Sequence, residues 1–254
     1  VYHVEGARRL QCTPLVHNGV MYVTNSNEVI ALDARTGRPI WRYKDDQVKR
    51  NDVNRGVALL DDKVYFVTSD AHLVALDART GALRWSHQYA DPKKGYFATL
   101  APMAVKDKIV VGVSGGDSGM RGFVAALDAR TGAEVWRTYT IPARGEPGSE
   151  TWGDLTIDWG GAGTWLSGTF DPALNLLYWT TGNPWPDFFA GDRDGDNLYS
   201  DSLLALDADT GKMRWYFQFT PKDVWDWDAQ AWPLLLDLPR SEERRVGKEC
   251  RSRW

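Results

Sequence analysis

One short pattern, A-L-D-A-x-T-G-x-x-x-W, occurs four times and constrains the fold more than any other feature of the sequence. The copies begin at Ala31, Ala75, Ala126 and Ala205, and each ends on a tryptophan. The first two intervals between copies are 44 and 51 residues, and the third is 79. Repeats of about 40–50 residues are typical of β-propeller blades, so the third interval indicates an insertion of roughly thirty residues.

The chemistry of each copy predicts a β-hairpin. In Asp-x-x-Thr-Gly the aspartate can accept hydrogen bonds from the amides ahead of it, and the glycine can take the positive φ that a tight turn requires. Runs of β-branched and aromatic residues flank the turns, at 21–24 and 64–68 before them and at 40–42 and 83–85 after them. We therefore predict an all-β chain of four-stranded antiparallel blades. The repeat alanine would lie where neighbouring hairpins approach closely, and a docking tryptophan would bridge each blade to the next (Trp41, Trp85, Trp136 and Trp215).

Four copies predict four to five blades. Propellers close with as few as four, so a complete small ring is one interpretation. Because the sequence opens directly at Val1 without a starting methionine, we favour an incomplete portion of a larger ring. Long insertions in a rigid repeat array tend to lie on one face and to carry function, so we expect the functional residues there.

The last fifteen residues, 240–254, differ from the rest of the chain. They show neither strand alternation nor repeat character, and they match the in-frame translation of a common sequencing adapter. We therefore predict a partial propeller over residues 1–239 and a non-native, disordered tail over 240–254. The alternative is a basic tail that binds nucleic acid.

Without that tail the chain is acidic, with 24 Lys and Arg against 31 Asp and Glu, a net charge of −7. Nucleic acid is not expected as a partner, because phosphate binding needs clustered positive charge. No apolar run approaches the ~20 residues of a membrane span. Cys12 is the one cysteine outside the tail, so no disulfide is expected within residues 1–239.

Five segments outside the repeats carry further motifs, and they occur in a fixed order. These are V-N-R-G at 53–56, S-G-G-D at 114–117, G-A-G-T-W at 161–165, T-G-N-P at 181–184 and T-P-K-D-V-W-D at 220–226. Together with the tryptophan repeat they resemble the pyrroloquinoline quinone (PQQ)-dependent alcohol dehydrogenases over about residues 1–239. The resemblance implies part of an eight-bladed β-propeller and a quinone site.

The resemblance also implies which residues bind PQQ, a planar quinone with three carboxylates. Trp165 would lie flat against the ring, and Arg55 would contact the quinone oxygens. The other cofactor-binding residues implied are small or amide-bearing residues around the rim: Gln11, Thr99, Ser114, Gly115, Gly116 and Thr164.

A hard cation is the second expected cofactor, because it would polarise the quinone carbonyl that accepts hydride. The resemblance implies Asp226 as the catalytic base that takes the alcohol proton. An aspartate at 228 resembles the lanthanide-using branch of the family, and one more carboxylate suits a trivalent ion, so a lanthanide is favoured over Ca²⁺. The implied metal ligands are Asp117, Asn183, Asp226 and Asp228.

The sequence departs from the family pattern at several positions. Glutamate is usual where Asp117 stands, and many members have a glutamate where Gln11 stands. Lys49 and Arg50 align with a vicinal disulfide that covers the quinone in many members, so the second stacking face must come from other residues. Asp117 and Asn183 also sit in turn-like contexts, which is the alternative to a metal site.

The function implied is oxidation of a primary alcohol to an aldehyde, with electrons passed to a periplasmic cytochrome c or a quinone. A periplasmic location follows from the resemblance. The alternatives are a non-catalytic propeller that binds other proteins, because fold does not imply function, and a truncated fragment that is inactive by itself.

Overall fold

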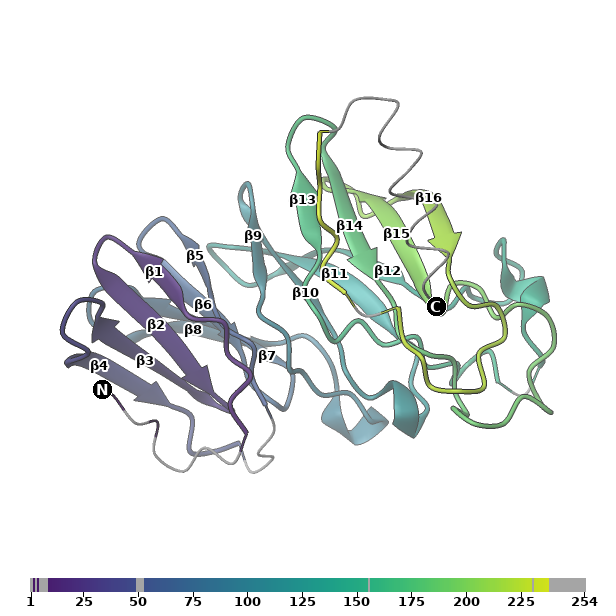
Figure 1. Cartoon of the computed structure of the whole chain (residues 1–254), viewed down its shortest axis with the longest axis horizontal. Helices are drawn as coiled ribbons and strands as arrows, with labels where there is room; N and C mark the ends of the chain where they lie inside the picture. The colour runs from purple at the N-terminus through teal and green to yellow at the C-terminus, as the bar shows by residue number, and fades with distance from the viewer. Residues whose placement is uncertain are drawn as a thin grey trace.

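The computed structural model describes residues 2, 4, 9–48, 53–154, 156–229 and 231–237. These form four antiparallel sheets of four strands each, which follow one another along the molecule from purple to yellow-green in Figure 1. The described residues contain three short 3-10 turns, η1 (Pro92–Lys94), η2 (Gly116–Ser118) and η3 (Ser149–Thr151), and no α-helix. The predicted all-β fold of four-stranded blades is confirmed.

Each blade is a meander in which consecutive strands pair. The first two blades contain β1 (Leu15–His17), β2 (Val20–Asn25), β3 (Glu28–Asp33) and β4 (Pro39–Lys44), then β5 (Ala58–Leu60), β6 (Lys63–Val67), β7 (His72–Asp77) and β8 (Leu83–Gln88). The next two contain β9 (Met103–Val105), β10 (Lys108–Gly112), β11 (Phe123–Asp128) and β12 (Glu134–Tyr139), then β13 (Thr169–Asp171), β14 (Leu176–Thr180), β15 (Ser202–Asp207) and β16 (Met213–Gln218).

Burial explains why the third and fourth strands of a blade have different sequences. The third strands, such as Val-Ile-Ala-Leu in β3 and Leu-Val-Ala-Leu in β7, are buried along almost their whole length. Both faces of β7 pack against neighbouring blades, whereas β3 packs one face on the second blade and the other on the stretch before β1, so both faces must be apolar. The fourth strands β4 and β8 alternate between exposed and partly buried side chains, as expected for an edge with one covered face.

The repeat turns have the predicted chemistry. Asp33 accepts hydrogen bonds from the Arg35 amide and from both the amide and the hydroxyl of Thr36. Asp77, Asp128 and Asp207 make the same three bonds in their own turns. The following glycines have φ of 71–77°, a backbone conformation that other residues adopt at a cost.

The docking role is confirmed for Trp41, Trp85 and Trp136, and it gives a second reason for the glycine in each repeat turn. For Trp215 it stays a prediction. The Trp41 indole N–H donates to the Ala78 carbonyl of the next blade at 3.0 Å. A Cβ on Gly81 would lie 2.6 Å from a ring carbon of Trp41. Because no side chain fits there, only glycine lets the indole lie on the turn, and Trp85 and Trp136 cover Gly132 and Gly211 in the same way.

The antiparallel meander puts two kinds of connection at one end of every blade. These are the loops between the second and third strands and those that lead to the next blade. The first kind lengthens along the chain: residues 26–27, 68–71, 113–122 and 181–201. The extra length of the third repeat interval is therefore not a single insertion, because it is shared by 140–168 and 181–201. Both stretches lie at the same end, as predicted.

Some predictions fall on residues that the structure does not describe. Lys49 and Arg50 lie outside the described residues, and so does the predicted tail at 240–254. Where the propeller domain ends and how many blades the whole ring has remain predictions. No helix in the described part of the chain is long and apolar enough to cross a membrane.

Candidate cofactor and metal site

A hollow of about 280 Å³ lies at the loop end of the blades. Seven segments line it: five connections between strands, the stretch before β1 and the stretch after β16, and the first and last of them are more than 200 residues apart in the sequence. Its lining residues are Arg9, Gln11, Val53, Arg55, Phe97, Thr99, Ser114, Gly115, Gly116, Asp117, Gly163, Trp165, Asn183, Asp226 and Asp228. Eleven of the twelve residues predicted from the sequence are in this set.

Backbone hydrogen bonds between loops hold the hollow in shape. Ser114 and Phe97 bond each other through both backbone groups, at 2.8 and 3.2 Å. The Thr164 amide donates to Val113, and the Gly182 amide donates to Gly163 at 2.7 Å. Successive loops are therefore joined like the strands of a small sheet, which gives rigid support to residues that stand outside regular strands.

Arg55 and Trp165 form the aromatic and cationic wall. The Arg55 guanidinium lies 4.7 Å from the centre of the Trp165 ring and donates to Gln11 Oε1 at 2.8 Å and to Thr99 Oγ1 at 2.5 Å. Thr99 in turn lies 3.0 Å from Ser114 Oγ. A guanidinium fixed by this many partners is pre-organised to meet a carboxylate or a carbonyl oxygen.

The floor of the hollow is backbone. Gly115 has φ 117°, and a Cβ there would collide with the carbonyl oxygen of Gly95. Gly116 begins η2, which also contains Asp117. With no side chains at 115 and 116, a flat ligand can approach the backbone closely.

Thr164 is the exception among the predicted cofactor-binding residues. Its side chain is fully buried, and its hydroxyl donates to the Phe123 carbonyl at 2.6 Å and accepts from the Val113 amide at 2.8 Å. It does not line the hollow. The hydroxyl joins the 164 loop to the third blade, and a cofactor-binding role for Thr164 stays a prediction.

Asp228 is placed by three neighbours. Its Oδ1 accepts the Asn183 amide at 2.9 Å, and the Trp165 side chain also hydrogen bonds to it. A Cβ on Gly182 would collide with the same oxygen. Burial, together with the nearby Asp226 and Asp117 carboxylates, raises the pKa of Asp228 to about 6.

Asn183 has a defined amide orientation. Its Nδ2 donates to Asp187 Oδ1 at 2.8 Å and to the Pro184 carbonyl at 3.4 Å, which leaves the side-chain oxygen available for a cation. Asp187 was not predicted from the sequence. Burial raises its pKa, and the carboxylates of Asp117 and Asp226 raise it as well.

Asp226 is exposed at the mouth of the hollow with φ 63°. Burial raises its pKa, followed by the charges of Asp117 and Asp223. Carboxylates whose pKa values are raised by burial and by one another's charge form a group that a bound cation would stabilise. Within the described ranges no three His, Cys, Asp or Glu side chains suffice to hold a metal ion. The Asn183 amide oxygen and oxygens of a bound ligand would have to complete the coordination.

The residues present fit both cofactors. The carboxylate and amide oxygens suit a hard cation, and the Trp165–Arg55 wall beside a bare glycine floor suits a planar anion. Sequence reasoning missed four lining residues, Arg9, Val53, Phe97 and Gly163, besides Asp187. The β-bridge of Phe97 with Ser114 is a tertiary contact, and no sequence pattern announces it.

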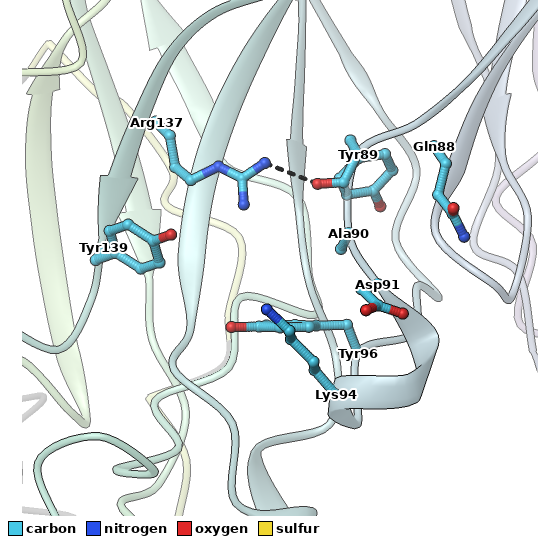
Figure 2. A pocket seen from close by; sticks show the side chains of 8 residues that line it. All are labelled: Gln88, Tyr89, Ala90, Asp91, Lys94, Tyr96, Arg137 and Tyr139. Carbon is cyan, nitrogen blue, oxygen red and sulfur yellow. Dashed lines mark hydrogen bonds between the residues drawn. The ribbon is translucent and has the colours of Figure 1, made fainter.

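A second hollow, of about 320 Å³, lies between the ends of β8 and β12. Figure 2 shows Arg137 donating to the Tyr89 carbonyl, with Tyr96 and Tyr139 also in the lining. Arg137 additionally pairs with Glu134 and stacks over Phe123, and the Tyr96 hydroxyl donates to the Arg121 carbonyl at 2.9 Å. The Arg137 guanidinium and the Tyr96 hydroxyl therefore already have partners within the protein.

Fold and site together define the class of protein: a blade-repeat propeller with a hollow at its loop end, whose residues fit a planar anionic cofactor and a hard cation. The model of the PQQ family, described as the glucose/ethanol/alcohol dehydrogenase β-propeller domain, matches residues 2–247. The chain therefore belongs to this family.

Comparisons with individual proteins agree with this family assignment. The chain is 45% identical to the quinohemoprotein alcohol dehydrogenase ADH IIB of Pseudomonas putida, with 92% of this chain and 37% of that protein aligned. The crystal structure of a quinohemoprotein alcohol dehydrogenase from Comamonas testosteroni superposes with a TM-score of 0.86 at 39% identity, over 92% of this chain and 38% of that one. A europium-containing methanol dehydrogenase gives 0.82 at 37% identity, over 89% and 44%. The chain thus spans well under half the length of these proteins.

Proposed function

We propose that the chain is the cofactor-binding part of an alcohol dehydrogenase that oxidises a primary alcohol to an aldehyde. The supporting observation is that Asp226 lies in one hollow with the Trp165–Arg55 wall and the oxygen ligands Asp117, Asn183 and Asp228. The named relatives are alcohol dehydrogenases. A protein-binding scaffold would need no such convergence.

In this proposal each side chain has a distinct task. Trp165 and Arg55 hold the quinone flat and oriented, and Asp226 accepts the hydroxyl proton of the alcohol. When bound, PQQ supplies the hydride acceptor, and the cation supplies the Lewis acid that activates it. The raised pKa of Asp226 brings its basicity closer to that needed for a proton acceptor near neutral pH.

We further propose a lanthanide rather than Ca²⁺ as the cation. Asp228 adds a carboxylate beside Asp226, Asp117 and Asn183, and a trivalent ion gains more than a divalent one from that additional negative charge. A europium-containing methanol dehydrogenase is among the similar structures. A periplasmic location and a cytochrome c or a quinone as electron acceptor are parts of the same proposal.

The test is alcohol-dependent dye reduction by the full-length protein, reconstituted with PQQ and either Ca²⁺ or La³⁺. We expect activity with short primary alcohols, and higher activity with La³⁺. No reduction with either metal would remove the enzyme proposal and leave the scaffold. Higher activity with Ca²⁺ would overturn only the metal assignment.

A further inference from the structure

The loop that carries the proposed base has little regular structure to support it. It follows β16, and Lys222, Asp226 and Asp228 all have positive φ, of 50°, 63° and 48°. Side-chain-bearing residues occupy this region only at an energetic cost, so surrounding contacts must hold them there. Those contacts determine where the carboxylates of Asp226 and Asp228 point.

Asp223 provides the closest of these contacts. Its side chain is fully buried, Oδ1 accepts the Trp225 amide and Oδ2 accepts the Trp227 amide, both at 2.9 Å. These two amides belong to the residues on either side of Asp226. One carboxylate therefore uses both oxygens to fix the backbone before and after the proposed base, which is a local side-chain-to-backbone arrangement that competes with other loop conformations.

Arg193 connects this arrangement to the loop that contains Asn183. Its guanidinium is fully buried and donates to the backbone carbonyl of Asp223 at 2.6 Å, to that of Pro186 at 3.0 Å and to Asn197 Oδ1 at 2.8 Å. Burial lowers the pKa of Arg193, and the charge of Asp223 is the largest opposing influence. A buried guanidinium needs such a counter-charge, so the two residues stabilise each other.

We propose that Asp223 is a positioning residue, which holds Asp226 and Asp228 toward the hollow while Arg193 keeps their loop in register with Asn183. Asp223 does not line the hollow, so it acts through the backbone of the loop and not on a ligand. The inference rests on the proposed function for the role of Asp226, but the geometry of the loop is independent of it.

The experiment compares D223N, D223E and D196N in the full-length protein loaded with PQQ and La³⁺. D223N keeps the shape but replaces one acceptor oxygen with a donor that faces an amide. We expect kcat per PQQ-loaded site to fall by about a hundredfold, since small displacements of a reacting group have effects of this size. KM for the alcohol should not change. D223E keeps a carboxylate opposite Arg193 and should retain an intermediate kcat.

D196N is the matched control, because Asp196 is an exposed aspartate in the same pair of loops and the charge change is identical. It should keep the wild-type kcat. Circular dichroism reports whether each variant folds. If D223N does not fold, the kcat of D223E tests the proposal in its place. Wild-type kcat in every folded Asp223 variant would overturn the proposal.

A second readout does not depend on turnover. Tb³⁺ emission sensitised by Trp165 is titrated in PQQ-free protein, with D228A to identify the signal from the hollow. D223N should weaken Tb³⁺ binding by about tenfold, as supporting residues around metal ligands typically do. If the wild type oxidises no alcohol but Tb³⁺ binding still depends on Asp223, the alcohol dehydrogenase proposal fails and the positioning role stands. Unchanged Tb³⁺ affinity in D223N would contradict the positioning role.

Discussion

The two hollows of the molecule are similar in size but differ in chemistry. The hollow beside Tyr96 and Arg137 measures about 320 Å³, and the one beside Trp165 about 280 Å³. In the first, the Arg137 guanidinium and the Tyr96 hydroxyl pair with neighbouring protein groups. In the second, the pKa values of Asp226 and Asp228 are raised and Asn183 leaves its oxygen available. Volume therefore does not identify the site, whereas converging carboxylates with raised pKa values beside an available amide oxygen do.

The largest expected difference between the hollows is in catalysis. D226N removes the proposed base but keeps its shape, so kcat for a primary alcohol should fall by about 10²–10⁴-fold, the usual contribution of a general base. Y139F, in the other hollow, should leave kcat unchanged. Dye-coupled assays of both variants at saturating PQQ and La³⁺ measure this, and a D226N enzyme with wild-type kcat would contradict the assignment.

In the metal-free protein, the wild type and D228N should differ in stability by an amount that depends on pH. Because the pKa of Asp228 is raised to about 6 from 3.8, the folded state binds more protons than the unfolded state between these values. The contribution of Asp228 to the free energy of unfolding is thus most favourable below about pH 4, and it decreases as the pH rises through about 6. D228N should raise the free energy of unfolding at pH 8 by up to about 3 kcal/mol, with little effect at pH 3.5.

The effect of D228N on the free energy of unfolding at pH 8 should change sign when the cation is bound. Urea unfolding at both pH values, with and without La³⁺, checks this: with saturating La³⁺ at pH 8, D228N should be less stable than the wild type, since a ligand of the ion is lost. Equal destabilisation by D228N in all four conditions would argue for a purely structural role of Asp228.

A smaller effect is expected from Asp187, which orients the Asn183 amide. D187A should weaken La³⁺ binding by about tenfold, at the low end for a partner that orients a metal ligand. Competition with Tb³⁺, read from tryptophan-sensitised emission, gives the affinity. D158N serves as the control, because Asp158 is an exposed aspartate that pairs with Arg144 away from the hollow, and equal affinities of D187A and D158N would refute the role of Asp187.

The smallest effect is expected from removing a hydroxyl in the hollow beside Tyr96 and Arg137. Y96F removes one hydrogen bond to the Arg121 carbonyl, so the free energy of unfolding should decrease by about 1 kcal/mol. Thermal and urea unfolding measure the change, and alcohol oxidation should stay at the wild-type level. A large loss of activity in Y96F would show that the two hollows are functionally linked, and the contrast between them would no longer hold.

Much of the architecture could be predicted from local chemistry. The repeated turn, its aspartate and its glycine act within a few residues, and the docking tryptophan recurs at a fixed offset, so the blades follow from the pattern. The motif residues lie in connections that the meander brings to one end, which is why eleven of the twelve predicted site residues line one hollow.

The remaining details could not be predicted because they depend on which loops become neighbours. The Thr164 hydroxyl bonds to the backbone of two distant segments and does not line the hollow. Phe97 reaches the hollow through its bridge to Ser114. Neither outcome is encoded by residues close in sequence.

The sequence by itself determined the blade, the way one blade docks on the next, and the residue types at the site, because these depend on short-range periodicity and turn chemistry. Only the tertiary structure decided the orientation of the Asn183 amide, the hold of Asp223 on the loop around Asp226, and the burial of Arg193 between the two loops. The physical reason is that these features arise from hydrogen bonds and desolvation across segments that meet only when the blades pack together.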